Sequence, residues 1–231
     1  MDARVPVIGA SGDLGLGLAM RWAAAGVAVT IGSRDAGRAR EAAARVRGAL
    51  PDADVEGLAN PEAAAAGPIV VLCVPFAAQL PTLATLADSL APGSLLVDCT
   101  VPLATAVGGR PTQALGVWAG SAAQQAQALL GEEIPVVGAF HTVSAATLAD
   151  PRHELAEDVL LCGRRKADKA RVARLVERIP GLRPVNAGPL ETARIVETLT
   201  PLLISVNGRY RTHAGLRLTG LPAGDHWGGD R

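Results

Sequence analysis

Short apolar runs, each bounded by glycine, proline or aspartate, recur along roughly the first 140 residues of the chain. Runs of this length that are apolar throughout are typical of strands buried on both faces of a sheet. They are Val5–Ile8, Val27–Ile31, Ile69–Val74, Leu95–Val97 and Ile134–Val137. The segments between them predict helices at Leu14–Ala25, Asp35–Leu50, Ala77–Leu90 and Ser121–Leu130. This alternation predicts an α/β fold with a doubly wound, parallel sheet.

The pattern of apolar positions changes toward the end of the chain. The stretch DVLLCG at 158–163 predicts one more strand, and the amphipathic segment Lys166–Ile179 predicts a helix. Residues 180–189, PGLRPVNAGP, are rich in proline and glycine and therefore predict a loop. Leu190–Val206 predicts a long helix that bends at Pro201.

These segments predict two domains and a tail. Residues 1–140 form the expected nucleotide-binding domain, which has a Rossmann-type sheet. Residues 141–219 form the expected smaller C-terminal α/β domain, which closes over the ligand of the first. Residues 220–231 are rich in glycine and predict an irregular tail.

Charge and hydropathy exclude several classes of partner. The 22 basic residues balance the 22 acidic ones, so the chain has no overall field that would attract nucleic acid or an anionic membrane. No apolar stretch reaches the ~18 residues of a membrane span. The start of the chain also lacks the pattern of a signal peptide. We therefore expect a cytoplasmic protein that binds small molecules and neither nucleic acid nor membranes.

The three cysteines, Cys73, Cys99 and Cys162, lie far apart in the sequence. They form no CxxC pair, so the sequence predicts neither a disulfide framework nor a structural zinc site. Cys73 and Cys99 lie in or next to apolar strand-like runs, where a small buried thiol is the ordinary interpretation. We expect no metal site in this protein.

A glycine-rich turn follows the first predicted strand. Its residues Ala10 to Gly15, ASGDLG, match the GxGxxG fingerprint of dinucleotide-binding folds, with Ala10 in place of the first glycine and an extra Gly9 before it. Gly12 would let the backbone approach a pyrophosphate, and Gly15 would let the helix pack against the strand. The free N–H groups at the start of the helix would then face the phosphates. The alternative is an ordinary tight turn between strand and helix.

The residues after the second predicted strand indicate which dinucleotide binds. An acidic residue is usual there in proteins that bind NAD, because it accepts hydrogen bonds from the ribose 2′-hydroxyl. This chain has Ser33 and Arg34 instead, and Arg38 lies four residues later on the same helix face. Serine and arginine attract a 2′-phosphate, so these residues favour NADP. The alternative is a pair of solvated arginines on a surface helix.

The sequence lacks the usual proton donors for carbonyl reduction. The chain has one tyrosine, Tyr210, and alanine occupies the position four residues later, where short-chain dehydrogenases have lysine. The predicted long helix contains neither lysine nor histidine, and the two lysines, Lys166 and Lys169, lie in a charged segment. An acceptor that is itself a conjugated ring, such as a flavin or deazaflavin, needs no such donor, because its ring delocalises the charge. We expect no obligatory catalytic acid or base.

His141 and Thr142 follow the last predicted strand of the first domain. They should therefore lie at the carboxyl end of the sheet, where ligands bind in such folds. His141 could donate a hydrogen bond to an acceptor ring and orient it. The alternative is a structural histidine that connects the loop to the second domain.

Several stretches together resemble one family of enzymes. They are GASGDLGLGLA, GSRDAGRA, VPF, FHTVSAA, GLRPVNAGPL and ETARIVETLTPLLISVN. They are similar to the NADPH-dependent F420 reductases, which are F420H2:NADP oxidoreductases. The resemblance extends from about Val5 to Leu218, and its C-terminal elements are more specific than the glycine loop.

The resemblance implies direct hydride transfer between the nicotinamide C4 of NADP(H) and C5 of the deazaflavin coenzyme F420, and a homodimer. It places the pyrophosphate at Ser11, Gly12, Asp13 and Leu14, and the 2′-phosphate at Ser33, Arg34 and Arg38. It places the nicotinamide near Val74 and Pro75, and the deazaflavin beside His141, Thr142, Val143 and Ala145. Because the far end of F420 is anionic, we also expect a cationic patch made of Arg209, Arg211 and Arg110.

The chain departs from the family pattern at two places. Asp13 stands where a neutral residue is expected, and its carboxylate must point away from a pyrophosphate to be tolerated. The tail after Thr219 also extends beyond the family pattern. Two other functions stay open. One is an NADP-dependent reductase of a carbonyl, an imine, or a flavin or ferric substrate, and the other is a non-catalytic regulator that senses NADP.

Overall fold

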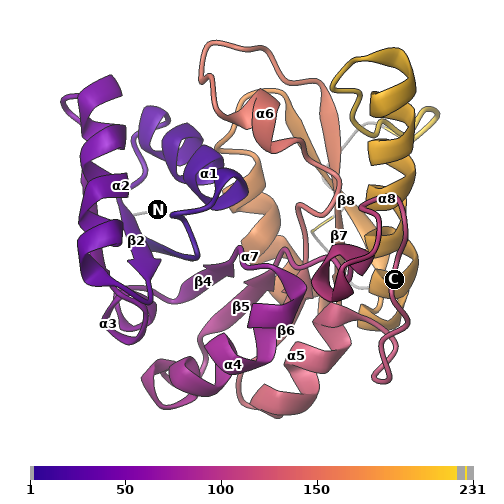
Figure 1. Cartoon of the computed structure of the whole chain (residues 1–231). Helices are drawn as coiled ribbons and strands as arrows, with labels where there is room; N and C mark the ends of the chain where they lie inside the picture. The colour runs from indigo at the N-terminus through magenta and orange to yellow at the C-terminus, as the bar shows by residue number, and fades with distance from the viewer. Residues whose placement is uncertain (1–2, 223–226, 228–231) are drawn as a thin grey trace.

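One eight-stranded sheet forms the centre of the molecule (Figure 1). The computed structural model describes residues 3–222 and Trp227, and the structural statements below refer to these residues. The strand order is β3-β2-β1-β4-β5-β6-β7-β8. All neighbouring strands pair in parallel except β6 and β7, which are antiparallel. The α/β, Rossmann-like fold predicted from the sequence is therefore confirmed.

The strands are short, as expected of a buried parallel sheet. They are β1 (Val5–Ile8), β2 (Val29–Ser33), β3 (Val55–Ala59), β4 (Ile69–Leu72), β5 (Leu95–Asp98), β6 (Val136–Gly138), β7 (Glu157–Gly163) and β8 (Leu182–Gly188). The helices are α1 (Asp13–Ala24), α2 (Ala36–Ala49), α3 (Asn60–Ala65), α4 (Phe76–Leu86), α5 (Ala122–Leu130), α6 (Ala145–Leu148), α7 (Lys166–Val176) and α8 (Ala193–Tyr210). Short 3₁₀ turns lie at Ala87–Ser89, Ala104–Val107 and Leu190–Thr192.

The sequence pattern missed the two edges of the sheet. β3 and α3 were not predicted, and most of residues 180–189, from Leu182 to Gly188, forms strand β8 instead of the predicted loop. Edge strands are half exposed and tolerate polar residues, proline and glycine, because one side needs no ladder hydrogen bonds. Glu56 and Gly57 in β3, and Pro184 and Asn186 in β8, therefore hid the strands from a search for apolar runs.

The sheet continues across the predicted domain boundary at residue 140. β7 and β8 lie beyond this position, yet they extend the sheet that β1 to β6 form. The division into two domains stays a prediction, and the sheet itself is one unit. α8 runs through Pro201 to Tyr210, which is four residues beyond the predicted end of the long helix.

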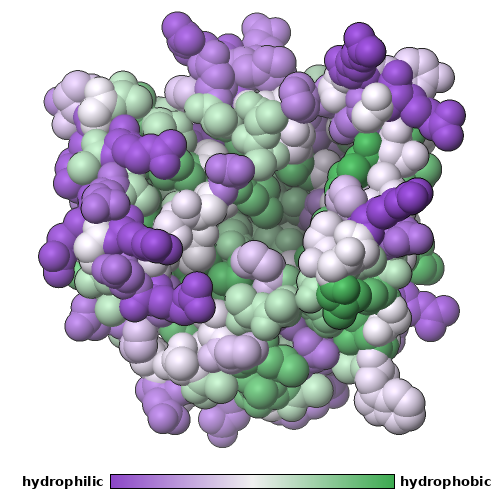
Figure 2. Space-filling model, in the orientation of Figure 1, coloured by the Kyte–Doolittle hydropathy of each residue, from purple (hydrophilic) through white to green (hydrophobic). Residues whose placement is uncertain are grey.

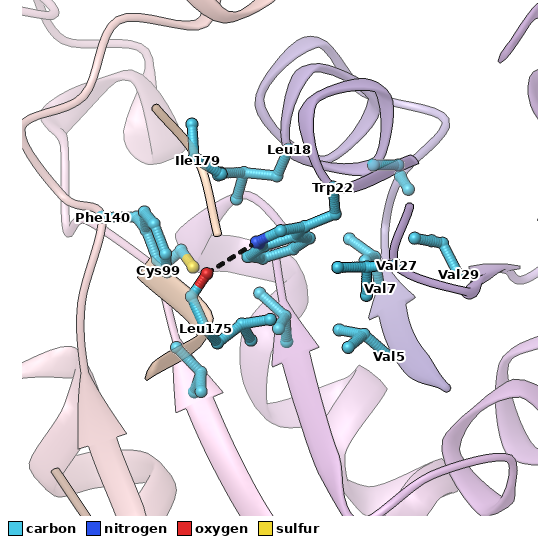
Figure 3. Close-up of a cluster of buried hydrophobic side chains, with 14 of the residues drawn as sticks. Val5, Val7, Leu18, Trp22, Val27, Val29, Cys99, Phe140, Leu175 and Ile179 are labelled. Atoms are coloured by element: carbon cyan, nitrogen blue, oxygen red, sulfur yellow. Dashed lines mark hydrogen bonds between the residues drawn. The ribbon is translucent and has the colours of Figure 1, made fainter. Parts of the chain in front are cut away.

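The core on one face of the sheet is built around Trp22 of α1. Its indole Nε1 donates a hydrogen bond to the Leu175 carbonyl at 3.0 Å, and the ring of Phe140 packs edge-on against it with centroids 5.8 Å apart (Figure 3). Phe140 has a positive φ of 61°, which is uncommon outside glycine. Its ring is buried in this core, so the segment that leads from β6 to His141 is firmly held.

The carboxyl ends of the parallel strands converge on one edge of the sheet. β1 pairs with β2 on one side and β4 on the other, so the chain order reverses beside β1. Ligands of doubly wound folds bind at such a switch point. Among the described residues, no helix is long and apolar enough to cross a membrane. The cytoplasmic location stays a prediction.

Candidate functional site

A cleft of about 510 Å³ opens at the carboxyl ends of β1, β2 and β4. It brings together eight residues that the sequence singled out for cofactor binding: Gly9, Ser11, Gly12, Ser33, Arg34, Arg38, Val74 and Pro75. Five further residues line it: Asp35, Asn60, Cys73, Ala78 and Thr82. Segments as far apart in the sequence as β1 and α4 thus form one concave surface.

Gly9 lets the loop after β1 pass close to the end of β4. Its φ is +82°, and a Cβ built on it would overlap the carbonyl oxygen of Cys73 and the side chain of Val74. A side chain is therefore excluded both by the backbone conformation and by the space available. This close approach joins the loop of β1 to the wall formed by Cys73, Val74 and Pro75.

The start of α1 supplies the second wall of the cleft. Gly12 is the N-cap residue, and no side chain caps the helix there. A Cβ on Gly12 would meet only the Gly9 carbonyl oxygen at 3.4 Å, so the cleft side of this residue is open. Gly15 faces the protein, where its Cβ would lie 2.7 Å from the Cα of Ala10. The open start of a helix attracts anions through its N–H groups and its dipole.

Asp13 and Leu14 do not line this cleft. Asp13 is exposed in the first turn of α1 and lines a separate cavity of about 510 Å³ between α1, α2 and α6, together with Arg45 and Ala145. An acidic residue in the first turn stabilises the helix dipole. Its position outside the cleft keeps the carboxylate away from the open start of α1.

The opposite end of the cleft is cationic. β2 ends at Ser33, two residues later than predicted, so Arg34 follows the strand directly. The Asp35 carboxylate accepts hydrogen bonds from the N–H groups of Gly37 at 2.7 Å and Arg38 at 3.4 Å and so caps α2. Arg34 and Arg38 have no ion-pair partner among the residues that the structure describes. Two unpaired guanidinium groups beside one cleft are suited to hold a phosphate.

Sequence reasoning missed Asn60, which lines the cleft beside this cationic end. Its side chain is 4% exposed, and its Oδ1 has no hydrogen-bond partner within the described structure. A buried acceptor without a donor is costly, so it indicates a place for a ligand donor. No signal in the sequence marked Asn60, because the preceding strand β3 was not recognised.

His141 follows the carboxyl end of β6, as predicted, but its ring is buried. The residue is 5% exposed, and neither ring nitrogen has a well-formed hydrogen bond within the described structure. Burial lowers the pKa of His141 to about 4, and the Asp98 backbone carbonyl only partly offsets this. The ring is therefore neutral at physiological pH. The His141 carbonyl accepts a hydrogen bond from Thr200 Oγ1 of α8 at 2.7 Å, which ties the segment to that helix.

The other residues predicted beside the deazaflavin are spread over a wider area. Thr142 and Val143 are each 7% exposed, and Ala145 lines the cavity that contains Asp13. Arg209 and Arg211 lie at the C-terminal end of α8, and Arg110 lies in the loop before α5. None of these three arginines lines the cleft, so their role stays a prediction. Figure 2 shows an apolar hollow between the polar surface over α2 and the side of the molecule that carries α8.

A buried acidic network connects β5, α4, α5 and α8 behind the site. Gln79 Nε2 donates to the Asp98 carboxylate at 2.7 Å and to the Ala122 carbonyl at 2.9 Å. The Glu197 carboxylate accepts the N–H groups of Ala122 at 2.9 Å and Ala123 at 3.1 Å and so caps α5. The sequence analysis noted Glu197 only as an ionisable residue of the long helix. Its place in the network could not be read from the sequence.

Both carboxyls of this network should make stability depend on pH. Burial raises the pKa of Asp98 to about 6 and that of Glu197 to about 8. Unfolded carboxyls lose their protons near pH 4, so between that pH and the folded pKa the unfolded state binds fewer protons. The free energy of unfolding should therefore fall as pH rises, by on the order of 1 kcal/mol per pH unit for each group. Thermal melts between pH 5 and 8 measure this fall.

Glu197→Gln should flatten this dependence between pH 6 and 8, because the amide cannot ionise. Glu191→Gln is the matched control, since Glu191 is exposed just before the same helix. An equal slope in wild type and in the Glu197 variant would contradict the assignment of the raised pKa to Glu197.

The fold and the cleft together define a dinucleotide-binding protein of the Rossmann type. The family model described as "NADP oxidoreductase coenzyme F420-dependent" matches residues 4–102. Relatives named F420-dependent NADP reductase match almost the whole chain. The relative from Methanothermobacter thermautotrophicus is 42% identical, and the match covers 96% of this chain and 97% of the relative. The relative from Methanocaldococcus jannaschii is 39% identical, and the match covers 94% of this chain and 99% of the relative. The chain belongs to the F420-dependent NADP reductase family.

One solved structure agrees with this assignment, and a second shares the fold. A protein from Arthrobacter sp. FB24, provisionally described as an F420-dependent NADP reductase, is 29% identical and covers 92% of this chain and 96% of its own, with a TM-score of 0.76. A Bacillus cereus imine reductase has 17% identity and a TM-score of 0.58, and covers 90% of this chain and 63% of its own. At that identity the match concerns the fold alone.

Proposed function

We propose that the protein is an oxidoreductase that transfers hydride directly between NADPH and the deazaflavin coenzyme F420. The chain belongs to the F420-dependent NADP reductase family, and one observation carries this proposal. One cleft joins an open helix start to two arginines that form no ion pair with any residue the structure describes. The family relatives support the pair of cofactors, and the cationic end of the cleft supports NADP over NAD.

The residues present fit NADP. In the proposed arrangement the start of α1 at Ser11 and Gly12 holds the pyrophosphate, and Ser33, Arg34 and Arg38 hold the 2′-phosphate. Asn60 lies at the same end of the cleft, and its Oδ1 would accept a hydrogen bond from a donor group of the ligand. Val74 and Pro75 position the nicotinamide. When bound, the nicotinamide supplies the hydride and the deazaflavin ring accepts it, so the protein has to align the two rings and exclude water.

None of the described residues that line the cleft is tyrosine, lysine or histidine. The cleft therefore lacks the groups that usually protonate an alkoxide during carbonyl reduction. Tyr210 lies 76% exposed at the end of α8, and Lys169 donates to Asn186 Oδ1 at 2.6 Å and to the Gly188 carbonyl at 2.8 Å. This arrangement favours a conjugated ring as the acceptor.

A spectroscopic assay tests the function. The protein, NADPH and oxidised F420 are mixed, and the loss of deazaflavin absorbance is followed; NADPH with FMN, an imine or a simple ketone forms the parallel set. We expect turnover with F420 only. Turnover with ketones or imines would support a different reductase, and NADPH binding without turnover of any acceptor would support the regulator.

We expect His141 to orient the acceptor without donating a proton. His141→Gln should slow hydride transfer by roughly one to two decades, because only positioning is lost. The neutral ring also predicts that kcat is independent of pH between 6 and 8. Complete loss of turnover in a folded variant that still binds both cofactors would show that His141 transfers a proton.

We also propose that the protein is a homodimer that pairs through α8. Ile195 and Leu202 of this helix are 59% and 58% exposed. Their spacing places them on one helix face together with the half-buried Leu199 and Val206. An apolar stripe of this kind on a surface helix indicates an interaction site. A second copy of the chain fits it, because a two-fold axis brings the same stripe onto itself.

Leu202→Glu should convert the dimer to a monomer, since a charge buried at an interface costs several kcal/mol. Light scattering during size-exclusion chromatography measures the mass. Arg194→Glu, on the same helix but away from the stripe, is the control. A monomeric wild-type protein, or a dimeric Leu202 variant, would argue against this interface.

A further inference from the structure

Two of the three cysteines meet below the cofactor cleft, although they are 26 positions apart in the sequence. β4 and β5 are parallel neighbours in which Leu72 is paired with Asp98. The next pair in this register is Cys73 and Cys99. The β4–β5 ladder reaches Cys99, because the Cys99 N–H donates to the Leu72 carbonyl of β4 at 3.0 Å. On its other side the Cys73 N–H donates to the Ile8 carbonyl of β1 at 2.8 Å, so Cys73 still runs as part of the sheet.

The two side chains point to the same face of the sheet. Cys99 belongs to the core around Trp22, and Cys73 packs against that core; Figure 3 shows Cys99 beside Phe140. The Cys73 thiol is a near neighbour of the Cys99 thiol, because it helps to raise the pKa of Cys99. Neighbouring strands lie about 4.8 Å apart, and disulfides form at Cα separations of about 4.4–6.8 Å. The backbone therefore already holds the pair at a bridging distance.

The two thiols differ in access. Cys73 is partly exposed and lines the cofactor cleft, whereas Cys99 is 4% exposed and lies behind it. A reagent can therefore reach Cys73 from the cleft, and Cys99 can reach only Cys73. Both thiols are free in the structure. This is the arrangement of an attacking thiol and a resolving thiol.

We propose that Cys73 and Cys99 form an oxidation site that low-molecular-weight disulfides convert to an intramolecular disulfide. The Cys73 thiolate attacks one sulfur of the reagent, so a mixed disulfide forms and one reagent thiolate leaves. The Cys99 thiolate then attacks the Cys73 sulfur, so the protein disulfide forms and the second reagent thiolate leaves. The reagent disulfide gains two electrons, the protein thiols lose two, and the two thiol protons pass to solvent.

The environment of Cys99 determines the pace of the second step. Burial, the Cys73 thiol and the Asp98 carboxylate raise the pKa of Cys99 well above its usual range. The Asp98 carboxyl hydrogen-bonds Gln79 of α4 and acts on Cys99 only as the smallest of these causes. Thiolate is the attacking form, so ring closure should be slow at neutral pH and should accelerate as pH rises.

Closure of the disulfide affects the cleft directly. Cys73 lies between Gly9 and Val74, and its carbonyl oxygen lies where a Cβ of Gly9 would be. A disulfide turns the Cys73 side chain toward Cys99 and constrains this wall, and a misplacement of about 1 Å at a reactive site can cost about 100-fold in rate. A bound dinucleotide in turn covers Cys73. Oxidation and cofactor binding should therefore exclude each other. This coupling rests on the proposed function, whereas the formation of the disulfide does not depend on it.

Mass spectrometry after treatment with 2-hydroxyethyl disulfide tests the site. This reagent is neutral, so the arginines of the cleft do not attract it. After the remaining thiols are alkylated, cleavage before Asp88 separates Cys73 from Cys99. We expect one linked peptide pair that joins Cys73 to Cys99, with Cys162 alkylated. Dithiothreitol should release the link.

Three variants separate the steps. Cys162→Ser should form the same link, because Cys162 is buried elsewhere, at the end of β7. Cys99→Ala should stop at a lasting mixed disulfide on Cys73, and Cys73→Ser should leave Cys99 unmodified. A stable mixed disulfide on wild-type Cys73 with Cys99 free, or no modification of either thiol, would overturn the proposed site.

The coupling to the cleft has its own readout. NADP⁺ at about 100 times its Kd leaves roughly 1% of the protein free, so linking should slow by at least about tenfold. The oxidised protein should bind NADPH at least about tenfold more weakly, measured by the fluorescence of the nicotinamide, and dithiothreitol should restore binding. A linked protein that binds NADPH normally would overturn the coupling and leave the site itself intact.

Discussion

Arg34→Ala should raise the KM for NADPH by roughly 10- to 150-fold and leave the KM for NADH almost unchanged. A hydrogen bond to a charged group contributes about 1.5–3 kcal/mol, which corresponds to this range. NADH lacks the 2′-phosphate, so it loses nothing when the guanidinium is removed. Arg34 lies directly after β2 and lines the cleft with Ser33 and Arg38. Within residues 3–222, no ion pair competes for it.

The companion variants sharpen this experiment. Arg38→Ala should act in the same direction, and the double variant should lose at least about 100-fold, because two charged contacts are removed together. Arg40→Ala is the matched control and should change neither KM, because Arg40 is an exposed residue of the same helix that does not line the cleft. Equal losses for NADPH and NADH in the Arg34 variant would show that Arg34 does not bind the 2′-phosphate.

The central strands of the sheet could be predicted from the sequence because they are buried on both faces. β1 and β5 are fully buried, and their apolar runs were recognised with the correct start. The edge strands β3 and β8 carry Glu56 and Asn186, so the same criterion missed them. Burial on both faces, and not strand propensity, is therefore what an apolar run reports.

The candidate cofactor cleft could be predicted in part for a similar reason. Gly9, Gly12 and Arg34 lie at fixed offsets from strands that the pattern identified. Asn60 follows a strand that was missed, and Cys73 was interpreted only as a buried thiol. The pairing of Cys73 with Cys99 depends on β4 and β5 being neighbours in register, which residue spacing alone does not reveal. The same holds for Glu197, whose partners on α5 lie more than 70 residues away in sequence.

The glycines of the loop offer the second large effect, because they should fail for different reasons. Gly12 has an extended backbone with φ −91°, which any residue adopts, and its Cβ would meet only one atom at 3.4 Å. Gly12→Ala should therefore fold with a loss of stability below about 1 kcal/mol, which reflects the weaker N-cap. Gly15→Ala places its Cβ 2.7 Å from the Ala10 Cα, and overpacking of this kind costs about 1–3 kcal/mol.

Cofactor binding should instead be affected more by Gly12→Ala than by Gly15→Ala. The methyl group of the Gly12→Ala variant stands where the pyrophosphate approaches the start of α1, so the KM for NADPH and the KM for NADH should both rise at least about tenfold. This equal loss distinguishes the variant from Arg34→Ala, which affects NADPH alone. Thermal melts and steady-state kinetics on the Gly12, Gly15 and Arg34 variants measure both properties. If Gly12→Ala binds both dinucleotides as well as wild type does, the pyrophosphate does not lie at the start of α1, and the loop is only a tight turn between β1 and α1.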